Sequence, residues 1–245
     1  MPFGQLPVSG ASIPQYAPPY PEGLNHFKLS CVAVEYRTTA AAAAALLPDF
    51  LEIDETPLCR STIFTYHMSS VGAYNEYLHT IEVTWKGKKY DYVVILILDN
   101  ESAIFAGREQ WGFPKVWGNV ELTTKTGSSQ IVGSVERPKG LRFAHIGFTP
   151  RAKHTGPRPD IDARPSLTLR TIPSLSGASE PDIKELVSAH LDLSGGDLWV
   201  GKGSVAFPIA SELHPFAKLP IVEYGNAFYM TNVDAVLLLD DSWKL

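Results

Sequence analysis

The chain has 245 residues, of which 44% are hydrophobic and 19% are charged, and its formal net charge is −5. This is an ordinary globular composition, and one domain is the simplest interpretation. Basic residues are scattered along the chain, which argues against a nucleic-acid partner. We also expect no membrane partner, because the start of the chain lacks the basic and then apolar pattern of a signal peptide or a membrane span.

The first 23 residues contain six prolines, so they can form neither a helix nor a central strand. We expect residues 1–23 to be an extended arm and residues 24–245 to be a single domain. The chain has two cysteines, Cys31 and Cys59, too few for a disulfide framework. This usage is typical of a reducing compartment and predicts a cytoplasmic location.

The next segments predict a strand, a helix and a hairpin. Residues 29–36 favour a strand, and the alanines of 40–45 favour a helix that Thr38 or Thr39 caps and Pro48 ends. Two further strands, 80–85 and 90–98, flank a turn at Gly87. The second of these is a nearly continuous apolar run, which predicts a strand covered on both faces.

The second half of the chain favours short strands separated by turn-rich segments. We expect them at 119–124, 130–136, 140–148, 166–172, 186–193, 206–209, 221–228 and 233–239. Many strands and few helices predict a mainly antiparallel α+β fold. Its sheet is expected to curl or close into a barrel with an internal pocket.

Lys115 has the most apolar setting of any lysine in the chain. Trp111, Phe113 and Pro114 precede it, and Val116 and Trp117 follow it. Desolvation favours the neutral form of an amine, which is a nucleophile able to form a Schiff base with a ketone. A surface lysine whose stem lies along apolar surface is the alternative on local composition alone.

A longer pattern decides between these alternatives, because the chain resembles the acetoacetate decarboxylase family over about residues 20–240. The matching segments include Tyr36-Arg37-Thr38, Tyr74-x-Glu76, Leu98-Asp99-Asn100-Glu101, Gly107-Arg108-Glu109, Pro114-Lys115 and Arg164-Pro165. The resemblance implies a closed antiparallel barrel or cone with a few outer helices. It also implies that Lys115 is the Schiff-base residue and that Glu76 orients it or carries protons. Arg108 and Glu109 are expected to form an ion pair that locks the turn carrying Lys115.

Three positions depart from the family pattern. Val116 stands where a second lysine is usual, and Leu29 and Thr62 align with an arginine and a glutamate of the decarboxylase site. These changes put acetoacetate itself in doubt as the substrate and suit a larger, less charged ketone. We expect the substrate to contact Leu29, Thr62, Tyr74, Trp111 and Phe113.

The predicted activity is that of a carbon–carbon lyase, a decarboxylase-like enzyme that uses a Schiff base on a keto acid or related ketone. A Schiff-base aldolase or dehydratase of the same superfamily is the first alternative. A catalytically altered barrel that binds an apolar ketone or a polyketide-like ligand is the second. We expect no cofactor, and no metal because the histidines lack ligand spacing. We expect a homo-oligomer, since family members form oligomers.

Overall fold

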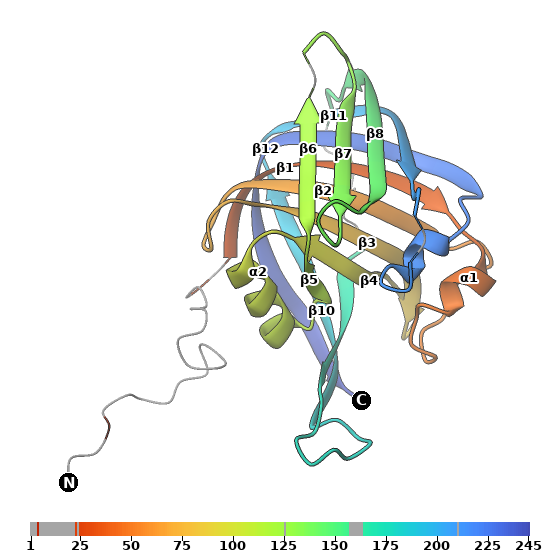
Figure 1. The fold of residues 1–245 in the computed structure, drawn as a ribbon, viewed down its shortest axis with the longest axis vertical. Helices are drawn as coiled ribbons and strands as arrows, with labels where there is room; N and C mark the ends of the chain where they lie inside the picture. Colours follow the sequence, from red (N-terminus) through yellow and green to blue (C-terminus); the bar gives the residue numbers. More distant parts are fainter. Residues whose placement is uncertain (1–3, 5–22, 24, 125, 157–163, 210) are drawn as a thin grey trace.

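The computed structural model describes residues 4, 23, 25–124, 126–156, 164–209 and 211–245, and the expected arm of residues 1–23 lies outside them except for Gly4 and Gly23. Figure 1 shows the elements in chain order. The strands of the first half are β1 (Asn25–Arg37), β2 (Leu58–Ser69), β3 (Tyr74–Trp85), β4 (Lys88–Leu98), β5 (Lys115–Trp117) and β6 (Asn119–Thr124). Those of the second half are β7 (Ile131–Glu136), β8 (Arg142–Lys153), β9 (Ser166–Ile172), β10 (Ile183–Ser194), β11 (Asp197–Ala206) and β12 (Glu223–Lys244). The helical segments are α1 (Ala40–Ala44), α2 (Glu101–Phe105), the π-helix η1 (Ala106–Gln110) and the 3-10 helix η2 (Pro215–Lys218).

The sheet closes on itself as a ring, which confirms the expected barrel-like closure. Its strands follow the order β1-β2-β3-β4-β9-β10-β12, and β12 pairs with β1 to complete the ring. Most pairs are antiparallel, as expected. The pairs β4–β5 and β4–β9 are parallel, which the sequence did not indicate.

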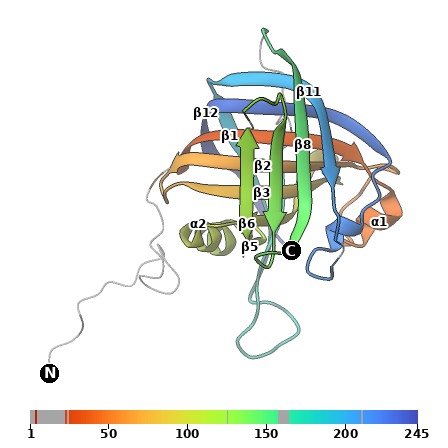
Figure 2. The ribbon, with the colours of Figure 1, turned by 45° about the horizontal axis from the view of Figure 1, so that its top comes forward.

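A second layer of strands packs on the outside of this ring. From β12 the sheet continues through β11, β8, β7 and β6, and Figures 1 and 2 show β6, β7 and β8 crossing over β1, β2 and β3. Alternate side chains of β1 therefore contribute to two hydrophobic cores, one on each face of the strand. Val32 and Val34 face the outer layer, whereas Leu29 and Cys31 face the inside of the ring.

Strands near the end of the chain differ from the predicted ones. The expected strand at 206–209 is wrong, because the strand there is β11 and it ends at Ala206. Its glycines hide it from a hydropathy pattern, and Gly203 is required because a Cβ there would lie 2.5 Å from Val34. The two strands expected at 221–228 and 233–239 are one, β12, which continues through Asn232 at a positive φ of 58°.

Two helical segments flank the ring. In α1 the Thr39 hydroxyl accepts a hydrogen bond from Ala42 N, as predicted, although the helix ends at Ala44, earlier than expected. The segment formed by α2 and η1 was not predicted. Its first turn is capped by Asn100, whose side chain accepts from Ala103 N at 2.9 Å, and it leads directly to Lys115.

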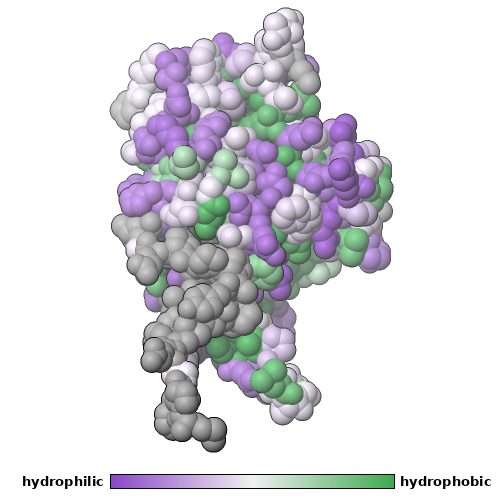
Figure 3. All heavy atoms as spheres, turned by 60° about the vertical axis from the view of Figure 1, so that its left-hand side comes forward, coloured by the Kyte–Doolittle hydropathy of each residue, from purple (hydrophilic) through white to green (hydrophobic). Residues whose placement is uncertain are grey.

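The face of the molecule in Figure 3 is largely hydrophilic, with separate small apolar patches. Among the described residues, no helix combines the length and the apolar character that crossing a bilayer requires.

Candidate active site

Lys115 is the first residue of β5 and pairs in parallel with Leu96 of β4. Only 8% of its surface is exposed. Pro114 holds the approach to the strand, and its carbonyl accepts a hydrogen bond from Leu96 N at 3.1 Å. The lysine is therefore fixed to a central strand rather than carried on a loose loop.

The Lys115 ammonium contacts a carboxylate inside the protein. Lys115 Nζ donates to Glu76 Oε2 at 2.9 Å, and Glu76 is 3% exposed. Glu76 lies on β3, where its register partners are Phe64 of β2 and Leu98 of β4. Burying either charge alone would be unfavourable, and the contact between the two charges offsets this cost.

A tyrosine completes this arrangement. The Tyr66 hydroxyl donates to Glu76 Oε1 at 3.3 Å, and the ring stacks on Tyr74 with centroids 4.4 Å apart. Burial raises the pKa of the Tyr66 hydroxyl well above its usual value, and the Glu76 charge adds to this shift. The hydroxyl therefore keeps its proton near neutral pH and stays a donor to Glu76.

The sequence patterns did not identify Tyr66 as a site residue. The one available signal was its spacing of two and four residues from Phe64 and Thr62, which puts all three on one face of a strand.

The backbone and stem of Lys115 are held by the segment before it. Arg108 Nη1 donates to the Lys115 carbonyl at 3.0 Å. We expected Arg108 to lock this turn through an ion pair with Glu109, and in the structure it donates to this backbone carbonyl instead. Gly107 lies against the lysine stem, where a Cβ would come within 2.6 Å of Lys115 Cδ.

A small cavity contains the lysine and three of the predicted substrate contacts. Tyr74, Trp111 and Phe113 line it with Lys115, together with Phe27, Val71, Leu237 and other mainly apolar residues. The Lys115 Nζ atom lies 5.7 Å from the centre of the Phe113 ring. This setting matches the apolar environment expected from the flanking sequence.

Leu29 and Thr62 line a second cavity, of about 70 Å³ and partly open to solvent, inside the ring. Lys115 is not among its lining residues. Phe64 and Leu78 do line it. Phe64 of β2 pairs with Glu76 of β3, and Leu78 lies two residues after Glu76 on β3. Lys115 thus lines the smaller cavity, whereas its partner Glu76 neighbours two residues that line the larger one, a division that the sequence did not indicate.

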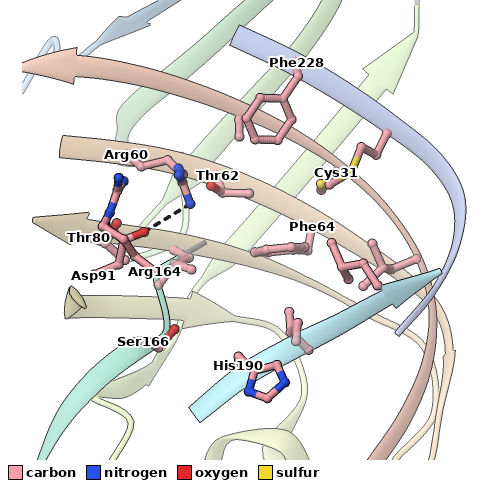
Figure 4. A pocket seen from close by; sticks show the side chains of 16 residues that line it. Cys31, Arg60, Thr62, Phe64, Thr80, Asp91, Arg164, Ser166, His190 and Phe228 are labelled. Carbon is pink, nitrogen blue, oxygen red and sulfur yellow. Dashed lines mark hydrogen bonds and ion pairs between the residues drawn. The ribbon is translucent and has the colours of Figure 1, made fainter. Parts of the chain in front are cut away.

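The larger cavity has an apolar side and a charged side. Figure 4 shows Cys31, Phe64 and Phe228 on one side and Arg60, Arg164 and Asp91 on the other. Asp91 accepts from Arg60 at 3.1 Å and from Arg164 at 2.7 Å. Glu35 pairs with Arg60 and Glu82 with Arg164, so the charges of both guanidinium groups are balanced by carboxylates.

Metal ligands are not grouped in the part of the chain that the structure describes: no three His, Cys, Asp or Glu side chains lie where they could hold an ion. The chemistry available at Lys115 is that of an amine, a carboxylate and a phenol.

The family model described as acetoacetate decarboxylase (ADC) matches residues 6–241. The chain belongs to the acetoacetate decarboxylase family. Within it, the chain is 37% identical over 223 residues to "Decarboxylase DEC1" of Cochliobolus heterostrophus, covering 89% of this chain and 88% of that protein. It is 32% identical over 227 residues to the acetoacetate decarboxylase of Clostridium acetobutylicum, covering 91% of each.

Solved structures of the family share the fold. One described as "Structural Studies of Acetoacetate Decarboxylase" superposes with a TM-score of 0.81 at 29% identity, covering 97% of this chain and 98% of that one. The acetoacetate decarboxylase of Legionella pneumophila gives a TM-score of 0.76 at 20% identity and covers 98% of this chain and 99% of that one. The expected fold and the assignment to a family of decarboxylase lyases are both confirmed.

Proposed function

We propose that this family member is a Schiff-base lyase that decarboxylates a keto acid bulkier than acetoacetate. The observation that carries the proposal is the buried contact of 2.9 Å between Lys115 Nζ and Glu76 Oε2 beside an apolar cavity. An amine in this position can attack a ketone once it is neutral, and the adjacent carboxylate can take the ammonium proton.

The reaction follows from these groups. Lys115 Nζ adds to the ketone carbon, water leaves, and a cationic imine forms. This nitrogen accepts the electron pair left behind as the carbon–carboxylate bond breaks and carbon dioxide departs. The resulting enamine takes a proton at carbon, with Glu76 as the nearest acid or base, and hydrolysis returns the free lysine. The apolar cavity excludes bulk water from the carboxylate and favours this loss of charge.

The substrate is inferred from the groups that replace the family's polar residues. Leu29 and Thr62 bring no charge to the larger cavity, and its two arginines are already paired with carboxylates. The carboxylate of any keto acid would therefore be buried without a free cationic partner, which is unfavourable, and a small keto acid has little apolar surface to offset this cost. Apolar side chains such as Phe64 and Leu78 instead suit a longer carbon chain.

A panel of β-keto acids of increasing chain length tests this proposal. Carbon dioxide release is measured, and borohydride trapping followed by peptide mass mapping locates the adduct. We expect acetoacetate to turn over weakly, longer acids to turn over faster, and the adduct to map to Lys115. Lys115→Arg keeps a cation beside Glu76 but cannot form the imine, so it should lose adduct and turnover together. Efficient use of acetoacetate, or activity that survives Lys115→Arg, would contradict the proposal.

The same assay separates the alternative activities. If an adduct forms but no carbon dioxide is released, condensation of the substrate with an aldehyde would indicate an aldolase, and loss of water from the substrate would indicate a dehydratase. Ligand binding without an adduct would indicate a pocket that has lost its chemistry.

We also propose a homo-oligomer in the cytoplasm. Cys31 and Cys59 are both buried in the protein, and so few cysteines suit a reducing compartment. Exposed apolar side chains on the ring and near it, among them Trp117 and Leu239, offer surface for contacts between subunits.

A further inference from the structure

The charged side of the larger cavity contains polar groups that the proposed chemistry does not use. Thr80 lines the cavity and is 3% exposed. Its hydroxyl is one of the few buried side-chain groups in the described part of the chain without a hydrogen-bond partner. Such an unpaired group is unfavourable by about 1–3 kcal/mol, and its presence calls for a function.

Arg164 adds further donors beside Thr80. Its Nε donates to Asp91 at 2.7 Å and its Nη1 pairs with Glu82 at 3.0 Å, so these two contacts use two of the five guanidinium N–H groups. A guanidinium group whose charge is balanced by two carboxylates has little need of an anion. Its spare N–H groups suit a neutral acceptor such as a carbonyl or hydroxyl oxygen.

The distance from the lysine limits where such an oxygen could lie. Thr80 is four residues beyond Glu76 on β3, which corresponds to about 13 Å at ~3.3 Å per residue. An extended carbon chain that starts at Lys115 and passes Phe64 and Leu78 would need roughly ten bonds to reach Thr80.

We infer that the cavity around Thr80 and Arg164 is a subsite for a neutral oxygen on the distal part of the substrate chain. The inference rests on the proposed function and makes it more specific: the substrate is a long-chain β-keto acid with a carbonyl or hydroxyl group remote from its reacting end. Thr80 and Arg164 would select for the position of that oxygen, and the apolar side of the cavity would hold the carbons between.

The test uses secondary alcohols, which are the reduced forms of the methyl ketones that decarboxylation would release. They form no Schiff base, so their binding does not depend on the chemistry of Lys115. Pairs of equal chain length are compared by calorimetry, one with a plain alkyl tail and one with a second hydroxyl group on the tail, so that neither contains a ketone. The oxygen is moved along the tail, and the ratio of the two Kd values gives the preference for it.

In the wild type we expect one oxygen position to bind best, near the tenth bond. Thr80→Val preserves the side-chain shape and removes the unpaired hydroxyl, so it should fold at least as well and reduce that preference about tenfold. Thr38→Val is the matched control, because Thr38 is also buried with an unpaired hydroxyl and does not line the cavity. It should leave the preference unchanged.

The absence of any preferred oxygen position, or a preference that survives Thr80→Val, would overturn the inference. A protein that shows the preference but gives no borohydride adduct with keto acids would contradict the proposed lyase and leave the subsite in place.

Discussion

Gly107 and Lys115 pack so closely that any side chain at position 107 would overlap the side chain of Lys115. A methyl group at position 107 would lie 2.6 Å from both Cδ and Cε of Lys115 and 3.3 Å from Nζ. The absence of a side chain at Gly107 is therefore what lets the lysine stem reach Glu76.

Gly107→Ala should impair catalysis more than it impairs folding. The atoms displaced belong to a flexible stem, and alanine is favoured over glycine in a helical segment, so we expect the free energy of unfolding to change by less than about 1 kcal/mol. The displaced amine should lose its contact with Glu76, and kcat should fall at least tenfold. Urea denaturation and steady-state kinetics measure the two effects. A variant with full activity would show that the lysine reaches its reactive position by another route.

Glu76→Gln should separate formation of the adduct from turnover. The amide keeps the shape of the side chain but cannot return a proton to the enamine, so we expect kcat to fall by about 10²–10⁴. Solvent can still deprotonate the amine, so the imine should form more slowly and borohydride should trap it on long incubation. Tyr66→Phe removes only the hydrogen bond to Glu76 and should have a smaller effect. Tyr229→Phe, a hydroxyl loss outside the site, is the control. Turnover of Glu76→Gln at the wild-type rate would rule out this role for the carboxylate.

A buried histidine should make stability depend on pH. His79 is enclosed between the ring and the outer layer, where Ser61 and Tyr77 contact its Nδ1, and burial lowers its pKa to about 3. The unfolded chain takes up this proton near pH 6.5, whereas the folded protein does not. Stability should therefore fall as the pH decreases from about 6.5 towards 3, by up to about 1.4 kcal/mol per pH unit for this group.

Urea denaturation at pH 7, 6 and 5 measures that slope. The slope for His79→Gln should be less steep than that of the wild type by this amount, whatever the stability of the variant at pH 7. Equal slopes for wild type and His79→Gln would mean that the folded protein accommodates the charged ring.

The oligomeric state is a further prediction. Light scattering coupled to size exclusion at micromolar concentration should give a mass that is a multiple of 26.9 kDa. If assembly uses exposed apolar residues near the ring, Trp117→Lys or Leu239→Lys should reduce the mass. A monomer would contradict the prediction.

The sequence could predict the closed sheet and the setting of Lys115, but not the organisation of the site. The apolar flanks of Lys115 are local and can be read directly, and its pairing with Glu76 was implied by the family motifs. The place of Tyr66 depends on the register of β2 against β3, and a slip of one residue would turn it to the other face. The division into two cavities depends on the side chains of several strands at once, so no local pattern contains it.

The long strand β12 has a consequence for how the protein is made. Asn25 pairs with Leu237, nearly the whole length of the chain away, and the ring is open until this pairing forms. A partly synthesised chain can therefore form hairpins from β1 to β4 but has no enclosed cavity around its lysine. Pairing of such distant segments is slow. The nascent enzyme should remain inactive until β12 has emerged from the ribosome and docked.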